Sequence, residues 1–338
     1  MVRRRARVQD ELRLDDIADH LGLNSRYPDP EFRDEASAAC LTRIAPIIRP
    51  LLPCTGTGLI EALASHFRVK FEEVYSDSDI ARLEEEYLRR KREIGFARLR
   101  EELESPGVDA LLFQRLRGNE TDEDHWVAVL NLQQSSDKYY WNKVHELTHR
   151  IAEPQQQVLP FRRHQMEAAN PVESLIDSIT RDIAFYPPVF RPLVLRAARR
   201  ADVLNFSVVE QLRREFAPAA SLQATMKAAV THWPRPVVAL TAAIRGRKGA
   251  PAQDRALRVR TEAYSSTALQ AELQFFPNMR VPRSSPAFSA NLNGWNSEDD
   301  ENLSTWTTSD GSQLADVAVF TSAKSIGKFG VYILVSAR

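Results

Sequence analysis

The spacing of apolar residues predicts alternating helices and strands over the first 185 residues. Apolar positions recur every three or four residues, as in helices with one buried face, over 57–67, 79–103, 139–152 and 172–185. Runs rich in β-branched and aromatic residues predict strands over 69–75, 108–116 and 126–133. The polar stretch 117–124 between the last two runs predicts a hairpin.

The pattern changes towards the C-terminus. A helical period continues over 189–230 with breaks near Asn205 and Pro218. Short apolar runs separated by Gly, Ser, Asn and Pro clusters then predict strands over 237–244, 257–264, 314–321 and 329–336. The acidic stretch 296–302 predicts a mobile loop. These patterns together predict an α+β protein.

The same patterns divide the chain into four parts. We expect an N-terminal extension over 1–55, a mixed helix and strand domain over 56–187, a basic helical segment over 188–235 and a β-rich domain over 236–338. The chain has 338 residues, which is enough for two or three domains, each with its own core.

Composition excludes several classes of protein. Lys and Arg total 45, Asp and Glu total 45, and 43% of residues are hydrophobic, so the chain is neither disordered nor uniformly basic. Its apolar runs are too short to span a membrane, and the basic start lacks the apolar stretch of a secretory signal. With two cysteines, Cys40 and Cys54, we expect a reducing, cytoplasmic location.

The balanced net charge conceals a basic segment. Residues 191–260 carry 14 basic and 4 acidic residues. One interpretation is solvated helix faces. The other is a DNA-binding surface, with a helix-turn-helix-like arrangement of 188–235. The candidate DNA-binding residues are Arg199, Arg200, Arg213, Arg214, Arg245, Arg247 and Lys248.

The strongest chemical signal is the pentapeptide His145-Glu146-Leu147-Thr148-His149 on a predicted helix. Residues i and i+4 share one face of a helix, so His145 and His149 can ligate one metal ion. Glu146 lies beside the first ligand and can face the water that the metal activates. An ordinary amphipathic helix with two structural histidines is the alternative.

A second predicted helix supplies matching acidic residues. It begins with Pro171-Val172-Glu173, and Glu173 can complete a site of two histidines and one glutamate with an open fourth position. Asp177, one turn later, can accept a hydrogen bond from the second nitrogen of a liganding histidine. This ligand set favours Zn²⁺, and Mn²⁺ or Fe²⁺ also suit it.

The chain over about 57–230 resembles the ImmA/IrrE family of metallopeptidases. That family has HExxH followed by a helix of the form E-x-x-A-N/D-x-F-A that ends in Leu-x-Pro. Glu173, Asp177 and Pro187 match this pattern. The positions that depart from it, where the family has Ala, Phe and Ala, are Ile176, Ile179 and Thr180.

The resemblance implies a zincin-like metallopeptidase domain over 56–187 and a GAF-like sensor domain over 236–338. It also implies a zinc-dependent endopeptidase that cleaves a helix-turn-helix repressor and derepresses stress or defence genes. DNA, in single-stranded form, or a small ligand would regulate it. The alternatives are a DNA-binding regulator whose zinc site is vestigial or structural, and a peptidase with broad specificity.

The chemistry of the site assigns roles to its residues. Zinc held by His145, His149 and Glu173 would polarise the scissile carbonyl and lower the pKa of water, and Glu146 would take the water proton and pass it to the leaving amine. A separate donor should stabilise the oxyanion. Its candidates are Tyr139, Tyr140 and His164.

Overall fold

The computed structural model describes residues 2–105, 108–115, 125–133, 138–154, 170–246 and 255–337, with side chains from residue 10 onward. The chain divides into two compact units, Met1–Val189 with Ala219–Ser221, and Phe190–Pro218 with Leu222–Arg338. Each unit contains helices and a sheet, so the predicted mixture of helices and strands is confirmed. Within these described ranges, no helix combines the length and hydropathy that a bilayer-spanning segment needs.

The first unit contains seven α-helices among its described residues. They are α1 (Val2–Leu21), α2 (Phe32–Ile48), α3 (Gly56–Phe67), α4 (Asp77–Leu83), α5 (Leu99–Glu104), α6 (Tyr139–Ala152) and α7 (Pro171–Ala184). Its strands are β1 (Val69–Val74), β2 (Ala110–Gln114) and β3 (Trp126–Asn131). The helices predicted over 57–67, 139–152 and 172–185 and the three predicted strands are therefore confirmed.

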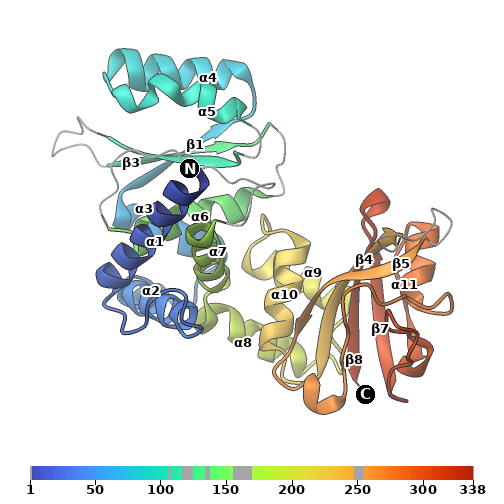
Figure 1. The fold of residues 1–338 in the computed structure, drawn as a ribbon. Helices are drawn as coiled ribbons and strands as arrows, with labels where there is room; N and C mark the ends of the chain where they lie inside the picture. Colours follow the sequence, from blue (N-terminus) through green and yellow to red (C-terminus); the bar gives the residue numbers. More distant parts are fainter. Residues whose placement is uncertain are drawn as a thin grey trace. The chain divides into compact units, whose positions relative to one another are not determined.

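The three strands form one small sheet with helices on both faces. Strand β3 is central, parallel to β1 and antiparallel to β2. Helices α4 and α5 cover one face, and α3 and α6 cover the other (Figure 1). All six residues of β3 are buried, as expected for a central strand covered on both sides. The sheet therefore supports α6, the helix that carries the HExxH motif.

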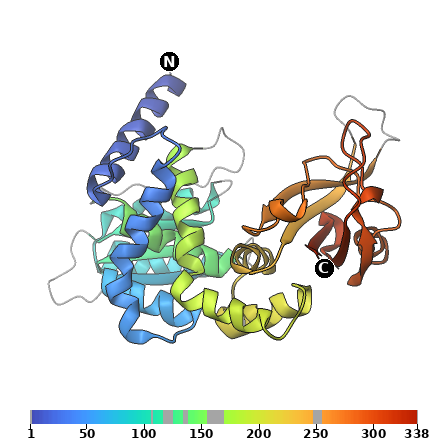
Figure 2. The same ribbon diagram turned by 90° about the horizontal axis from the view of Figure 1, so that it is seen from below.

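Residues 1–55, expected as an extension, contribute α1 and α2 to the first unit. Leu14, Ile17 and Ala18 lie on one face of α1 and are almost completely buried. Helices α1 and α2 both pack against α7, and Figure 2 shows these two blue helices alongside the yellow-green α7. Burial of this apolar stripe fixes α1 against the two helices of the candidate site.

The single long helix predicted over 79–103 is wrong. Helix α4 ends at Leu83, a π-helical turn follows over Glu84–Arg90, and a 3₁₀ turn over Ile94–Arg98 leads into α5. The break places Tyr87 and Phe96 in a stack against Phe113 of the sheet. Burial of these rings outweighs the local helix preference of the charged residues around them.

The second unit holds a larger, antiparallel sheet. Its strands are β4 (Val237–Arg245), β5 (Ala256–Tyr264), β6 (Ser297–Asn302), β7 (Ala318–Ser325) and β8 (Val331–Ala337), in the order β5-β4-β8-β7-β6. Its helices are α8 (Pro187–Ala198), which begins in the first unit, α9 (Phe206–Phe216), α10 (Leu222–His232) and α11 (Pro286–Asn293). The predicted breaks near Asn205 and Pro218 fall between these helices and are confirmed.

Alternate positions along the strands face opposite sides of this sheet. Val238, Leu240 and Ala242 of β4 join Trp306 in a core on the side covered by α11. The opposite side of β7 packs towards α9, where Lys324 pairs with Glu210 at 3.2 Å. The sheet is thus the middle layer of the second unit.

The acidic stretch 296–302, expected as a mobile loop, is instead mainly the edge strand β6. It pairs with β7 along its whole length. Its Glu298 accepts a hydrogen bond from Ser322, and Glu301 accepts one from Thr321. Pairing with β7 outweighs the low strand preference of acidic residues, and charge on an edge strand opposes pairing with other chains.

Candidate metal centre

Helix α6 buries polar residues as well as its apolar face. Val144, Leu147 and Ile151 pack into the core, but His145, Glu146 and His149 are also at most 6% exposed. Buried polar side chains are stable only with partners. The helix spacing brings the two imidazoles together, with their Nε2 atoms 3.1 Å apart. This arrangement is the one that the i, i+4 spacing predicts.

Helix α7 brings the third candidate ligand to the same point. Asn170 caps its N-terminus by accepting hydrogen bonds from the backbone of Val172 and Glu173, and Pro171 occupies the first helical position. In the first turn, Oε2 of Glu173 lies 3.3 Å from Nε2 of His145 and 3.6 Å from Nε2 of His149. The cap therefore fixes the start of the helix that positions Glu173.

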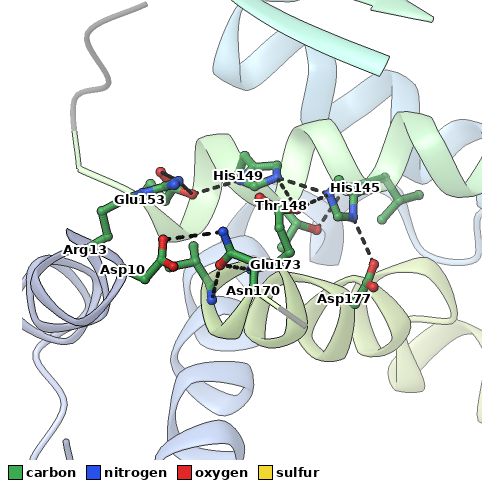
Figure 3. A network of polar contacts seen from close by, with 11 residues as sticks. Asp10, Arg13, His145, Thr148, His149, Glu153, Asn170, Glu173 and Asp177 are labelled. Atoms are coloured by element: carbon green, nitrogen blue, oxygen red, sulfur yellow. Dashed lines mark hydrogen bonds and ion pairs between the residues drawn. The ribbon is translucent and has the colours of Figure 1, made fainter. Parts of the chain in front are cut away.

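The donor atoms of His145, His149 and Glu173 all lie within 4.8 Å of one another. Figure 3 shows the two imidazoles of α6 facing the carboxylate of α7. Two imidazole nitrogens and one carboxylate oxygen form a suitable ligand set for a divalent transition metal. The three residues could therefore hold a metal ion.

The charges of the cluster fit a cation. Burial lowers the pKa of His149, but Glu173 and Glu153 outweigh burial and raise it to about 10. Burial raises the pKa of Glu173, but His149 and His145 outweigh burial and hold it far below its ordinary range. The carboxylates thus stabilise positive charge between the imidazoles. A divalent cation would supply this charge in place of protons on the two histidines.

Each of the two candidate histidine ligands also contacts a carboxylate through its other ring nitrogen. Oδ1 of Asp177 lies 3.2 Å from Nδ1 of His145, so Asp177 lies where the sequence predicts. Oε1 of Glu153 lies 2.8 Å from Nδ1 of His149. Glu153 was not predicted from the sequence, although it follows His149 by four residues, directly after the end of α6, and so continues the same helix face.

Glu146 differs from the other acidic residues of the site. It is 2% exposed, and its Oε2 has no hydrogen-bond partner within the described ranges. Burial raises its pKa, and the nearby His149 and His145 oppose that rise. A buried carboxylate with an unpaired oxygen is a candidate proton acceptor for an activated water.

The structure assigns other partners to the candidate oxyanion donors. The Tyr139 hydroxyl donates to Glu73, and the Tyr140 hydroxyl donates to the backbone oxygen of Ala184. His164 lies outside the described residues. Cys40 and Cys54 are not part of the ligand cluster, and burial raises the pKa of Cys40 to about 12.

The candidate DNA-binding residues belong to the second unit. Arg199, Arg200, Arg214 and Arg245 are exposed. Arg213 is half-buried and pairs with Glu210 at 2.9 Å, so part of its charge is neutralised. Arg247 and Lys248 lie outside the described residues.

Comparison with known proteins assigns this chain to no family. No protein-family model matches the sequence, and no curated protein matches it either.

Proposed function

We propose that the first unit is a zincin-like metallopeptidase domain of the ImmA/IrrE kind, which hydrolyses a peptide bond with the help of zinc. One observation carries this proposal. The donor atoms of His145, His149 and Glu173 converge within 4.8 Å, and Glu146, buried with an unpaired oxygen, lies on α6 with the two histidines. A purely structural site has no need of such a carboxylate.

The proposed chemistry assigns one task to each side chain. Zinc, when bound, acts as a Lewis acid that polarises a carbonyl and acidifies water. His145, His149 and Glu173 hold it, and Asp177 orients the ring of His145. Glu146 accepts the proton of the attacking water at its carboxylate and returns it to the leaving amine.

The substrate that we propose is a helix-turn-helix repressor, so that cleavage derepresses stress or defence genes. We further propose that residues 236–338 of the second unit form a GAF-like sensor domain that regulates cleavage. Its antiparallel five-stranded sheet, with α11 packed against it, supports this assignment. The exposed arginines Arg199, Arg200 and Arg214 favour DNA as the signal.

The decisive experiment separates metal binding from catalysis. We expect about one zinc per chain in the wild type and in Glu146→Gln, and none in His149→Ala, by plasma mass spectrometry. His66→Ala, on the exposed surface of α3, should retain its zinc. The absence of zinc from the reconstituted wild type would refute the proposal.

Cleavage tests the catalytic part. Glu146→Gln should lower the rate of repressor cleavage by a factor of about 10²–10⁴ because it removes the proton acceptor. If Glu146→Gln supports derepression as well as the wild type does, the protein is a DNA-binding regulator with a structural site. Cleavage of unfolded casein would indicate a broad peptidase, and equal cleavage with and without single-stranded DNA would argue against DNA as the signal.

A further inference from the structure

The N-terminal helix α1 reaches the candidate metal centre through one side chain. Arg13 donates hydrogen bonds from Nη2 to both carboxylate oxygens of Glu153, at 3.1 and 3.2 Å. The side chain of Glu153 is buried, at 7% exposed, and that of Arg13 is half-buried, at 24% exposed. Figure 3 shows this pair at the end of the network that contains the liganding residues.

Glu153 in turn contacts a candidate ligand. Its Oε1 lies 2.8 Å from Nδ1 of His149. When Nδ1 donates its hydrogen to this carboxylate, the lone pair of the neutral ring resides on Nε2, the nitrogen that faces His145 and Glu173. Glu153 therefore selects the tautomer and the ring orientation that metal binding requires.

Arg13 makes this position of Glu153 stable. A buried carboxylate without a cationic partner is strongly destabilising. With Arg13 in contact with both of its oxygens, the carboxylate of Glu153 is held in one orientation. The chain of contacts thus runs from α1 through Glu153 to His149.

The same helix also contacts the start of α7. Nδ2 of Asn170 lies 3.4 Å from Oδ1 of Asp10, and Asn170 is the residue that caps the helix carrying Glu173. Helix α1 therefore touches both elements that supply candidate ligands. This is a role for the N-terminal residues that their sequence does not indicate.

We propose that Arg13 and Glu153 are positioning residues of the metal centre, and that α1 is an integral part of it. This inference rests on the proposed metal site. It predicts that metal affinity depends on Arg13, which precedes Glu153 by 140 positions along the chain.

The test measures zinc affinity of the full-length protein by competition with a chromophoric chelator. Glu153→Ala and Arg13→Ala should each weaken zinc binding by about 10- to 100-fold, the usual effect of removing an outer partner of a ligand. The double variant should bind no more weakly than Glu153→Ala, because both substitutions break the same chain. Arg13→Lys, which keeps the positive charge but loses the planar guanidinium, should restore part of the affinity.

Two controls separate positioning from a general loss of structure. Arg26→Ala removes an arginine whose hydrogen bonds, among the described residues, go to Asp19, Leu23 and Ser25 rather than to α6 or α7, and it should leave zinc affinity unchanged. The visible absorption of bound Co²⁺ should change in Glu153→Ala and stay unchanged in Arg26→Ala, because it reports ligand geometry.

The results of these experiments separate a failure of the positioning role from a failure of the proposed metal centre. If the wild type binds zinc and Arg13→Ala and Glu153→Ala bind it equally tightly, the positioning role is refuted while the metal centre stands. The positioning role is also refuted if the effects of the two substitutions add. If the wild type binds no zinc, both proposals fall.

Discussion

Oδ1 of Asp177, on α7, lies 3.2 Å from Nδ1 of His145, on α6. Asp177 follows Glu173 by one turn of α7. This pair connects the two helices of the candidate metal centre through a second contact, besides that of Glu173. Because Nδ1 faces a carboxylate, the other nitrogen, Nε2, is left to point at Glu173 and His149. Helix α7 therefore presents both a candidate ligand, Glu173, and a carboxylate, Asp177, beside another candidate ligand.

Asp177→Asn should weaken zinc binding by about 10- to 100-fold, since it removes the negative charge that lies beside Nδ1 of His145. Chelator competition measures the change. Asp182→Asn is the matched control, because Asp182 lies on the same helix but accepts a hydrogen bond from Ser37. Equal zinc affinities for Asp177→Asn and the control would contradict an orienting role.

Gly330→Ala should destabilise the second unit by at least about 3 kcal/mol. Gly330 has φ +115°, and an added Cβ would lie 2.0 Å from the backbone oxygen of Ala242 on the neighbouring strand. Denaturant unfolding followed by tryptophan fluorescence measures the effect. Gly246→Ala, whose added Cβ would have no atom of the described residues within 4 Å, should change stability by less than about 0.5 kcal/mol. Similar small effects at both positions would contradict the predicted clash.

Arg115→Ala should lower the unfolding free energy of the first unit by about 3–5 kcal/mol, because it leaves the carboxylate of Glu93 buried without this partner. Nε of Arg115 lies 3.3 Å from Oε1 of Glu93, and the two side chains are 6% and 2% exposed. Arg89→Ala breaks an exposed pair with Glu85 and should have an effect below about 1 kcal/mol. A loss in Arg115→Ala no greater than that in Arg89→Ala would overturn this prediction.

Glu301→Gln should change the pH dependence of the second unit. Burial raises the pKa of Glu301 in the folded protein, although Thr321 and Ser285 donate to its carboxylate and oppose the rise. A raised folded pKa stabilises the fold at low pH, and this contribution is lost as pH rises from about 4.5 through the raised pKa.

Denaturant midpoints between pH 4 and 8 test this prediction. The wild type should lose stability relative to Glu301→Gln as pH rises, because the glutamine does not ionise. Asp299→Asn, on the exposed part of the same strand, is the matched control. Parallel pH curves for the wild type and Glu301→Gln would contradict a raised pKa of Glu301 in the folded protein.

Local periodicity predicts much of the fold. Helix α6 has the predicted bounds, α7 begins one residue before its prediction, and four apolar C-terminal runs contribute to β4, β5, β7 and β8. Proline and asparagine mark helix starts and breaks because their effects on the backbone are local, as at Asn170-Pro171 and Asn205. Predictions of this kind need only neighbours in the chain.

The two wrong predictions share one physical cause. The charged residues around Tyr87 favour a continuous helix, yet the stack with Phe96 and Phe113 requires a break. The acidic run of β6 favours a loop, yet pairing with β7 makes it a strand. In both cases a partner distant in the sequence outweighs the local preference.

The sequence by itself determined the candidate ligands. The spacing of His145 and His149 needs only helix geometry, and it also places Glu153 on the same face. The tertiary structure alone decided that Glu173 meets both imidazoles and that Arg13 holds Glu153. These contacts join separate helices that pack through their apolar faces, and such packing depends on the whole buried core rather than on any local pattern.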